Sequence, residues 1–334
     1  MNGKRWAALG IAAGVFIISV IINMASAMVF GDFTKVFEEN MMGSQKFKEE
    51  VVESGNPLER IAVLEVDGVI QDTGNEPPYF SSPGYSHRNF MEQLDQIKED
   101  NSVKGIVLRV NSPGGGTNES AELRQKIVEI REETKKPVYV SMGAMAASGG
   151  YYISAPADKI YASPETLTGS LGVIMQGVNY SELTDNIGID FMTIKSGKYK
   201  DIMSGHRKMT EEEVEILESM LTNSYNEFVR IIAEGRDMPE DRVRELADGR
   251  VYDGRQAKEL DLIDEFGYTD DVIEAMKKDY ELEEAEVFKY SSSAGWGSLL
   301  TMTAQKFSGG SEMGELINKL STPNSPRMMY LYAQ

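Results

Sequence analysis

Three short segments of the chain carry residues that could act together on a substrate. The first, residues 109–116 (RVNSPGGG), follows an apolar run and ends in three glycines, whose backbone N–H groups can approach a ligand closely. Such a loop can cradle a phosphate or stabilise an oxyanion. It lacks the Lys-Ser/Thr ending of a P-loop and the spacing of a dinucleotide-binding loop. A plain strand-to-helix turn explains these residues equally well.

The second segment, residues 143–153 (GAMAASGGYYI), surrounds Ser148 with small residues where a strand would give way to a helix. The Ser148 hydroxyl would be accessible there, and the N–H of Gly149 could help to hold a developing negative charge. The segment is not the Gly-x-Ser-x-Gly elbow of α/β hydrolases. Taken alone, a serine that merely begins a helix is the commoner explanation.

A serine nucleophile needs a base to accept its proton. Of the two histidines, His206 stands in a polar stretch and could serve in principle, and His87 lies in a Gly/Pro/Ser-rich region. No aspartate is placed to orient either one. The third segment, residues 195–201 (KSGKYKD), offers lysines instead. A lysine amine can act as the base when burial lowers its pKa from about 10.4 towards neutrality. Three lysines in six residues are more commonly a solvated basic patch.

Composition removes several classes of function. The 334 residues include 34 basic and 53 acidic side chains, for a net charge of −19, whereas proteins that bind nucleic acid need clustered positive charge. There is no cysteine, which excludes disulfides, thiolate metal sites and a cysteine nucleophile. With only two histidines, a multi-histidine metal site is also not expected. We therefore predict no nucleic-acid partner, no metal and no organic cofactor.

Hydrophobic patterning predicts the elements that would position these segments. Strands are expected over 61–66, 103–110 and 137–141, with helices over 89–97 and 119–135 between them. This alternation is typical of an α/β fold with a mostly parallel sheet flanked by helices. Further helices are expected in the second half of the chain, over 210–234 after a capping box at Thr210, over 241–247 and over 271–280.

The beginning of the chain is an apolar run of residues 6–29. At about 1.5 Å per residue it is long enough to cross a bilayer core of roughly 30 Å. Lys4 and Arg5 precede it, which places the N-terminus in the cytoplasm and the remainder outside. A cleaved secretory signal is the alternative, since residues 25–27 (ASA) form an acceptable cleavage site. We favour an uncleaved anchor, because apolar cores of cleaved signals are typically shorter, about 7–15 residues.

Together and in this order, the three segments resemble the signal peptide peptidase A family of Ser-Lys proteases, whose fold is related to that of the Clp protease and the crotonases. The resemblance covers about residues 60–270. The segments 147–152 (ASGGYY) and 197–200 (GKYK) are its most specific parts. Residues 168–173 (TGSLGV) and 248–252 (DGRVY) are similar to further family segments.

The resemblance implies a role for individual residues. Ser148 is the expected nucleophile, Lys200 the general base, and Ser170 the hydroxyl that orients the lysine amine. The backbone N–H groups of Gly115 and Gly149 are the expected oxyanion donors, with Gly114 as the substitute for the first. Asp253 and Asp261 depart from the family pattern, where we expect a hydroxyl residue and a glycine.

The resemblance also implies an organisation and a partner. Residues 1–30 are expected to form the cytoplasmic tip and membrane anchor, 31–58 a linker, 59–282 the Ser-Lys protease domain, and 283–334 a partly flexible extension. Some family members are about twice as long and build each site from two tandem domains. A short chain must then obtain the missing half from a neighbour, which predicts a homo-oligomeric ring with Ser148 of one subunit facing Lys200 of the next.

The expected activity is hydrolysis of membrane-released, apolar peptides such as spent signal peptides, through an acyl-enzyme. Two alternatives stay open: a crotonase-type enzyme acting on acyl-CoA thioesters, and a non-catalytic membrane scaffold with the same fold. The apolar C-terminal run of residues 328–332 (MMYLY) is similar to such a substrate. We hypothesise that it occupies a site as an inhibitor or is cleaved by the enzyme itself.

Overall fold

The structure is a computed structural model that describes residues 14, 47–73, 85–291 and 328–332. Within these residues no helix combines the length and the apolar character needed to cross a membrane. The predicted anchor, residues 6–29, lies outside the described residues except for Gly14. Most of the Gly/Pro/Ser-rich stretch at 74–86 lies outside them as well.

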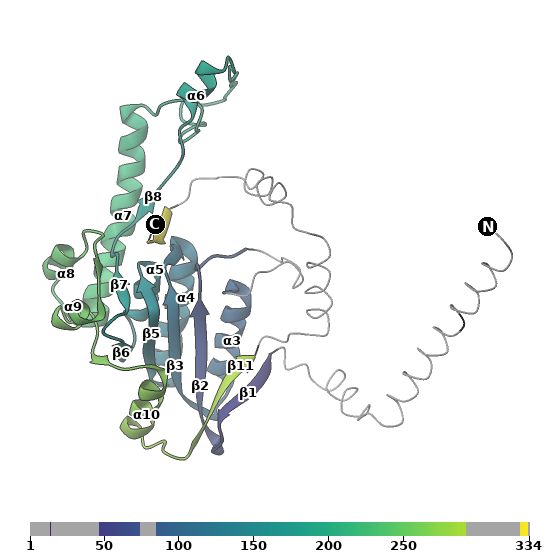
Figure 1. Cartoon of the computed structure of the whole chain (residues 1–334), viewed down its shortest axis with the longest axis vertical. Helices are drawn as coiled ribbons and strands as arrows, with labels where there is room; N and C mark the ends of the chain where they lie inside the picture. The colour runs from purple at the N-terminus through teal and green to yellow at the C-terminus, as the bar shows by residue number, and fades with distance from the viewer. Residues whose placement is uncertain (1–13, 15–46, 74–84, 292–327, 333–334) are drawn as a thin grey trace. The chain divides into compact units, whose positions relative to one another are not determined.

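A nine-stranded, mostly parallel sheet forms the body of the protein (Figure 1). Its main path follows the order β1 (Lys48–Glu53), β11 (Ala285–Ser291), β2 (Asn56–Asp67), β3 (Val103–Ser112), β5 (Val138–Ala147), β6 (Lys159–Ala162) and β10 (Glu265–Phe266). Two short strands lie off this path, where β7 (Leu167–Gly169) pairs parallel with the end of β5, and β9 (Val251–Tyr252) pairs antiparallel with β7. The predicted mostly parallel sheet is confirmed.

Helices follow the strands as the alternating pattern predicts. They are α3 (His87–Glu99), α4 (Thr117–Thr134), α5 (Gly149–Ser154), α6 (Ser181–Asn186), α7 (Glu211–Arg236), α8 (Glu240–Leu246), α9 (Gly254–Glu259) and α10 (Thr269–Asp279). The predicted capping box is present at the start of α7, where the Thr210 hydroxyl accepts from the Glu213 backbone N–H and the Glu213 carboxylate accepts from Thr210 N–H. These contacts satisfy two N–H groups that would otherwise lack a partner.

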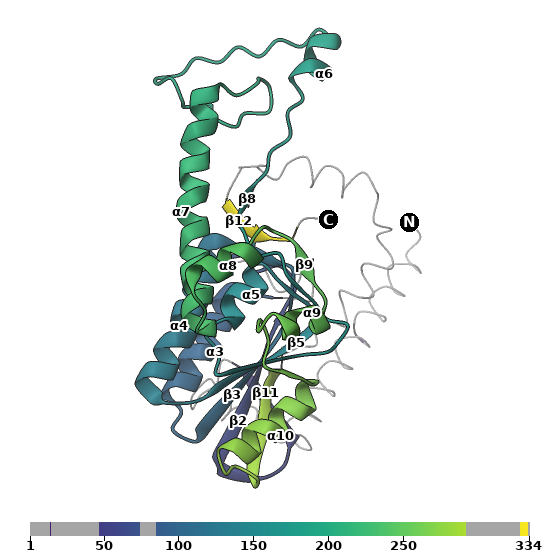
Figure 2. The same cartoon turned by 90° about the vertical axis from the view of Figure 1, so that its left-hand side faces the viewer.

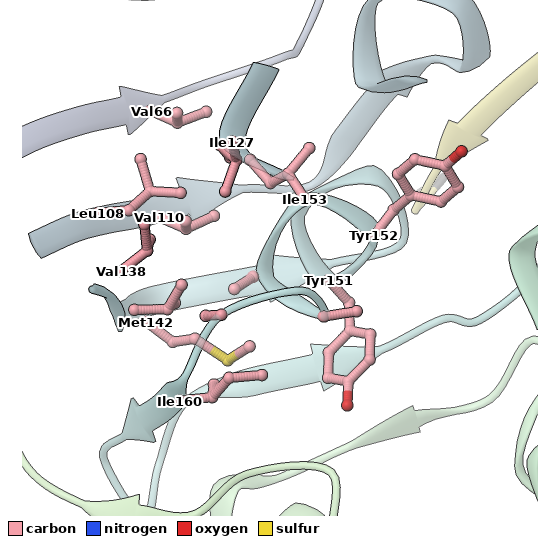
Figure 3. Packing of buried hydrophobic residues seen from close by; sticks show 14 of the residues in the cluster. Val66, Leu108, Val110, Ile127, Val138, Met142, Tyr151, Tyr152, Ile153 and Ile160 are labelled. Carbon is pink, nitrogen blue, oxygen red and sulfur yellow. The ribbon is translucent and has the colours of Figure 1, made fainter. Parts of the chain in front are cut away.

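Alternate residues of the strands enter two separate cores, because successive side chains of a strand point to opposite faces. On one face, Leu64 and Val66 of β2 and Leu108 of β3 pack with residues of α3, α4, α5 and α7. Figure 3 shows Ile127 of α4 and Ile153 of α5 within this cluster. On the other face, residues of β2, β3 and β5 pack mainly against α10 and β11. The sheet is therefore buried on both faces, as parallel sheets require.

A second, three-stranded sheet stands at the carboxyl end of β3. Its order is β4 (Gly114–Gly116), β12 (Met328–Leu331) and β8 (Ile174–Met175), with β12 antiparallel to both neighbours. The glycine loop singled out in the sequence is thus itself a strand. The apolar C-terminal run lies beside it.

Residues 176–220, here called the arm, extend from the sheet body. They comprise α6, the segments on either side of it and the N-terminal half of α7. Figure 2 shows α7 running away from the sheet, with α6 beyond its N-terminal end. A helix of 26 residues is about 39 Å long, so α7 separates the arm's tip from the sheet by a large distance.

Two strands of the main sheet fall where we predicted none. Residues 31–58 were predicted to be a linker, yet β1 occupies 48–53 and β2 already begins at Asn56. The extension over 283–334 was expected to be partly flexible, and β11 at its beginning lies between β1 and β2 in the main sheet. The edge strand β1 is mostly charged and exposed, whereas Val287 and Phe288 of β11 are buried in the two separate cores.

Candidate active site

Ser148 stands where the parallel strand β5 ends and helix α5 begins. Its backbone adopts φ 52° and ψ −112°, a conformation that costs a non-glycine residue about 1–3 kcal/mol. The surrounding structure imposes it, because Ser148 N–H donates to the Gly169 carbonyl at 2.8 Å and Ser148 C=O accepts from Tyr152 N–H at 2.9 Å. The residue is only 1% exposed. Such strain at a strand-to-helix turn is a common feature of functional sites.

Ser170 is brought next to Ser148 by the pairing of β5 with β7. The register places Ala147 opposite Gly169, so each serine is the first residue after a paired position on neighbouring strands. Strands paired in this way lie about 4.8 Å apart. Ser170 also has a positive φ, 50°, and its N–H donates to the Arg250 carbonyl at 2.7 Å. The two predicted serines therefore occupy one corner of the sheet.

The glycine loop is held from both sides. Gly114 C=O accepts from Ile70 N–H at 2.8 Å, and Gly116 N–H donates to Ile70 C=O at 2.8 Å. A Cβ on Gly115 would lie 1.9 Å from the Ile70 carbonyl oxygen, so only glycine fits there. On its other edge the loop pairs with the C-terminal strand β12.

The C-terminal run lies in the position of an added strand. Tyr330 is opposite Gly115, and Tyr332 N–H donates to the Pro113 carbonyl at 2.9 Å. A Cβ built on Gly114 would lie 2.0 Å from the Tyr330 carbonyl oxygen and 2.6 Å from Gly149 N. The Tyr330 carbonyl therefore lies beside Gly149, one of the two predicted oxyanion donors, and beside Gly114, the predicted substitute for the other.

The side chain of Tyr330 fills an aromatic pocket. Its ring stacks on Tyr152 of α5 with the centroids 4.7 Å apart, and lies 4.8 Å from the ring of Phe228 of α7. Its hydroxyl donates to the Ser224 carbonyl at 3.2 Å. Burial raises the pKa of Tyr152 to about 12 and raises that of Tyr330 as well, so both phenols stay neutral. Figure 3 shows Tyr152 directed towards the C-terminal strand and Tyr151 away from it.

Lys200 lies in the arm and is exposed. Its neighbour Lys198 forms an ion pair with Glu212 at the start of α7, and the Tyr199 hydroxyl also bonds to Glu212. The other end of α7 contacts α5 through Phe228, sixteen residues further on, which is about 24 Å along the helix. In Figures 1 and 2, α7 begins away from the sheet and ends beside the helices that cover it. Within one chain, Lys200 and Ser148 are therefore not brought together.

An ion-pair network that the sequence reasoning missed fixes the segment around Lys200. The carboxylate of Asp201, the next residue, accepts hydrogen bonds from Nε and Nη2 of Arg207 at 2.9 and 2.7 Å. The same guanidinium bonds both carboxylate oxygens of Glu213 in α7, at 2.8 and 2.5 Å. These bonds hold the pKa of Asp201 well below its usual range and lower that of Glu213 to about 2. Two-pronged contacts of this kind give a fixed orientation as well as energy.

Neither histidine has the place of a serine protease base. His87, which follows the Gly/Pro/Ser-rich stretch, is buried at the start of α3. Its Nδ1 contacts the Tyr85 hydroxyl at 2.7 Å and its Nε2 contacts Glu122 at 2.9 Å, so both ring nitrogens are engaged. His206 belongs to the arm, where it stacks on Phe191.

The two departures from the family pattern have plain structural explanations. Asp253 is the N-cap of α9, and its carboxylate accepts from Gln256 N–H at 2.8 Å, a role that Ser or Thr fills equally well. Asp261 follows the end of the same helix with φ 59°. Glycine is favoured at that position because it has no Cβ, and aspartate tolerates it. Neither departure touches the candidate site.

No group of acidic or histidine side chains that could hold a metal ion occurs among the described residues. The candidate site consists instead of hydroxyls, backbone amides and an aromatic pocket. Sequence reasoning predicted roles for Ser148, Ser170 and the glycines, and the pairing of β5 with β7 brings the two serines to one corner of the sheet. It missed the aromatic pocket, because nothing in the motif at 147–152 indicates whether Tyr151 or Tyr152 faces the C-terminal strand.

Comparison with known proteins gives a consistent picture. The pattern of Peptidase family S49 matches residues 130–283. A chain of Enterococcus faecium named signal peptide peptidase SppA is 40% identical over 353 residues, which cover 99% of each chain. Protease 4 of Salmonella typhi is 36% identical over 213 residues, or 64% of this chain and 33% of its own. The chloroplastic serine protease SPPA of Arabidopsis thaliana is 34% identical over 212 residues, 63% of this chain and 31% of its own.

Proposed function

The chain belongs to peptidase family S49 and is a serine peptidase, and on that premise we propose that Ser148 is its nucleophile and Lys200 of a second subunit its base. Ser170 would orient the lysine amine. The backbone N–H groups of Gly115 and Gly149 would hold the oxyanion.

The C-terminal strand carries this proposal. β12 runs antiparallel between β4 and β8, as an extended peptide would bind by strand addition, and places a carbonyl beside the glycines next to Ser148. In this arrangement Tyr330 stands for the residue on the acyl side of the cleaved bond. Its pocket of Tyr152 and Phe228 favours substrates with a large apolar or aromatic residue at that position.

The reaction follows from these groups. The neutral lysine amine accepts the Ser148 proton, and the serine oxygen attacks the substrate carbonyl carbon. The glycine amides stabilise the negative oxygen of the tetrahedral intermediate. The protonated amine then gives its proton to the leaving nitrogen as the C–N bond breaks. Water attacks the acyl-enzyme in the same way and releases the product.

A homo-oligomer is part of the proposal, because α7 keeps Lys200 away from Ser148 of its own chain. Most of the exposed large apolar side chains of the described residues belong to the arm and its base, with Met192 91% and Ile194 94% exposed. Contiguous exposed apolar surface is typical of a binding face. A second copy packed on the arm would cover these side chains and surround Lys200 with protein, which would lower the pKa of its amine.

Membrane attachment and substrate class complete the proposal. Residues 6–29 would anchor the enzyme in the cell membrane by a single span, with the N-terminus in the cytoplasm and the catalytic part outside. Signal peptides and other apolar peptides released in the bilayer would then be the natural substrates. The Enterococcus faecium relative carries the name of that activity.

Mixing two inactive variants tests the nucleophile, the base and their sharing at once. Ser148→Ala and Lys200→Ala should each abolish hydrolysis of a fluorogenic apolar peptide, since each removes one half of every dyad. Subunits of the two variants, dissociated and reassembled together, should regain activity, because some contacts then join an intact Ser148 to an intact Lys200.

The controls are each variant reassembled with itself, which should stay inactive. If the mixture of the two variants stays inactive while wild-type subunits treated in the same way regain full activity, the shared dyad is contradicted. A Lys200→Ala enzyme with wild-type turnover would contradict the lysine as base.

A serine-reactive probe separates the protease from the two alternatives. A non-catalytic scaffold would leave Ser148 unlabelled by a fluorophosphonate, whereas an activated nucleophile reacts with it. Hydrolysis or hydration of acyl-CoA thioesters without peptide cleavage would support the crotonase-type enzyme instead.

A further inference from the structure

A second serine borders the candidate oxyanion site. Ser120 lies in the first turn of α4, directly after the glycine strand β4, and is fully buried. Its Oγ has no hydrogen-bond partner within the part of the chain that the structure describes. Nearby buried serines differ in this respect: Ser112 Oγ accepts from Gly114 N–H at 3.0 Å, and Ser154 Oγ donates to the Gly150 carbonyl at 2.7 Å. A buried hydroxyl without a partner is costly and calls for an explanation.

Ser120 Oγ lies close to Gly149. A Cβ built on Gly149 would lie 2.8 Å from Ser120 Oγ, 3.0 Å from the Tyr330 carbonyl oxygen and 3.1 Å from Gly114 Cα. The hydroxyl therefore borders the small space that also holds the bound carbonyl and both glycines. The hydroxyl makes no hydrogen bond to that carbonyl, which belongs to an unreacted, planar peptide.

We propose that Ser120 is a third oxyanion donor, which engages only when the carbonyl becomes tetrahedral. The inference rests on the proposed role of Ser148. As Ser148 Oγ bonds to the carbonyl carbon, the C=O π pair moves onto the oxygen, which gains a full charge and room for a further hydrogen bond. The Ser120 hydroxyl rotates to donate to it and keeps its proton throughout. When the C–N bond breaks, the pair returns and the hydroxyl is released.

The energetics of the site fit this role. A donor that bonds substrate and transition state equally improves binding alone, whereas one that bonds only the transition state raises kcat. Donors in a water-excluded site are most effective when they are already in place before the reaction. Ser120 meets both conditions, because it is buried, lies on a helix, and has no competing partner in the substrate-like state.

Ser120→Ala in the full-length chain tests the inference. Removing one oxyanion donor lowers kcat by roughly a hundredfold, so that loss is expected here, with KM changed less than about threefold. The melting temperature should stay the same or rise, because the variant removes a hydroxyl that has no partner. Ser120→Gly serves as a second variant that cannot crowd the site.

A peptide aldehyde ending in tyrosine gives a second measurement. It forms a tetrahedral adduct with an active serine, so its inhibition constant should rise by about the same factor as kcat falls in Ser120→Ala. The matched control is Ser154→Ala, a buried serine whose hydroxyl has a partner. It should lower the melting temperature and leave kcat within about twofold of wild type.

The outcomes separate the two proposals. Wild-type kcat in Ser120→Ala, or a lower kcat with unchanged aldehyde inhibition, overturns the role of Ser120 alone. A wild-type chain that neither cleaves peptides nor binds the aldehyde overturns the proposed function and the Ser120 inference together.

Discussion

The sheet body and the arm bury their apolar residues to very different extents. In the body, strands and helices cover each other, and residues such as Leu64 and Phe288 are almost fully inaccessible. In the arm, Met192, Ile194 and Leu183 are largely exposed, and the fixed geometry comes from ion pairs around Arg207. The body is complete as a single chain, whereas the arm carries an apolar surface that a single chain leaves open.

This difference explains why the two proposed catalytic groups lie apart. Ser148 needs the rigid end of a packed sheet, because its strained backbone must be held by its neighbours. Lys200 lies on the exposed arm, and in our proposal a second subunit completes its surroundings.

A charge placed on the exposed apolar surface of the arm should have the largest effect on activity and assembly. Ile194→Asp would place a charge where we propose that the second subunit packs, and a buried unpaired charge costs enough to dissociate many complexes. We expect activity to fall at least roughly a hundredfold and the particle to become monomeric by light scattering in detergent.

The matched control for Ile194→Asp is Val51→Asp, an exposed apolar residue of the body on β1. It should leave both activity and particle size unchanged. An Ile194→Asp enzyme that remains assembled and active would show that the arm's apolar side chains do not form the contact.

A smaller effect is expected from the network that orients the arm's lysine segment. Arg207→Met removes the guanidinium that binds both Asp201 and Glu213, so Lys200 loses its fixed position. Misplacement of a reacting group by about 1 Å can cost up to about a hundredfold, and we expect kcat to fall tenfold to a hundredfold with little change in KM.

The pH dependence of stability provides an independent check on that network. Because the folded-state pKa of Glu213, about 2, lies below its ordinary 4.5, the network stabilises the arm fully above about pH 4.5 and is lost as the pH falls towards 2. Arg207→Met should weaken this acid dependence, as followed by proteolysis of the arm. An unchanged acid profile would contradict the stabilising role.

The smallest effect concerns a turn in the body. Asp261→Gly removes a Cβ from a residue with φ 59°, which relieves strain but adds freedom to the unfolded chain. We expect a net gain of about 0.5 kcal/mol, or roughly 1–2 °C in melting temperature, with activity unchanged. Asp264→Gly, which would remove the carboxylate that pairs with Arg236, should instead be destabilising.

Much of the body could be predicted from the sequence, because local patterns specify it. Apolar runs specified β2, β3 and β5, and Thr210 with Glu213 specified the start of α7. Ser148 and Gly115 could be proposed as site residues because their motifs combine small residues at fixed spacing.

What could not be predicted depends on contacts between distant segments. β11 carries charges and has no apolar run of its own, and it becomes a strand through its pairing with β2. The pocket around Tyr330 combines α5, α7 and the end of the chain. The partner of His87, Glu122, is 35 residues away on another helix, and a local motif does not encode such a pair.

The place of β11 in the sheet sets the order in which the strands can pair during synthesis. β1 reaches the sheet only through β11, whose first residue, Ala285, is made more than two hundred residues after Glu53. Contacts between such distant segments form slowly and late. During synthesis, β1 (Lys48–Glu53) therefore stays unpaired in the sheet until nearly the whole chain has emerged. A chain that stops before Ala285 would expose the edge of β2 to other strands.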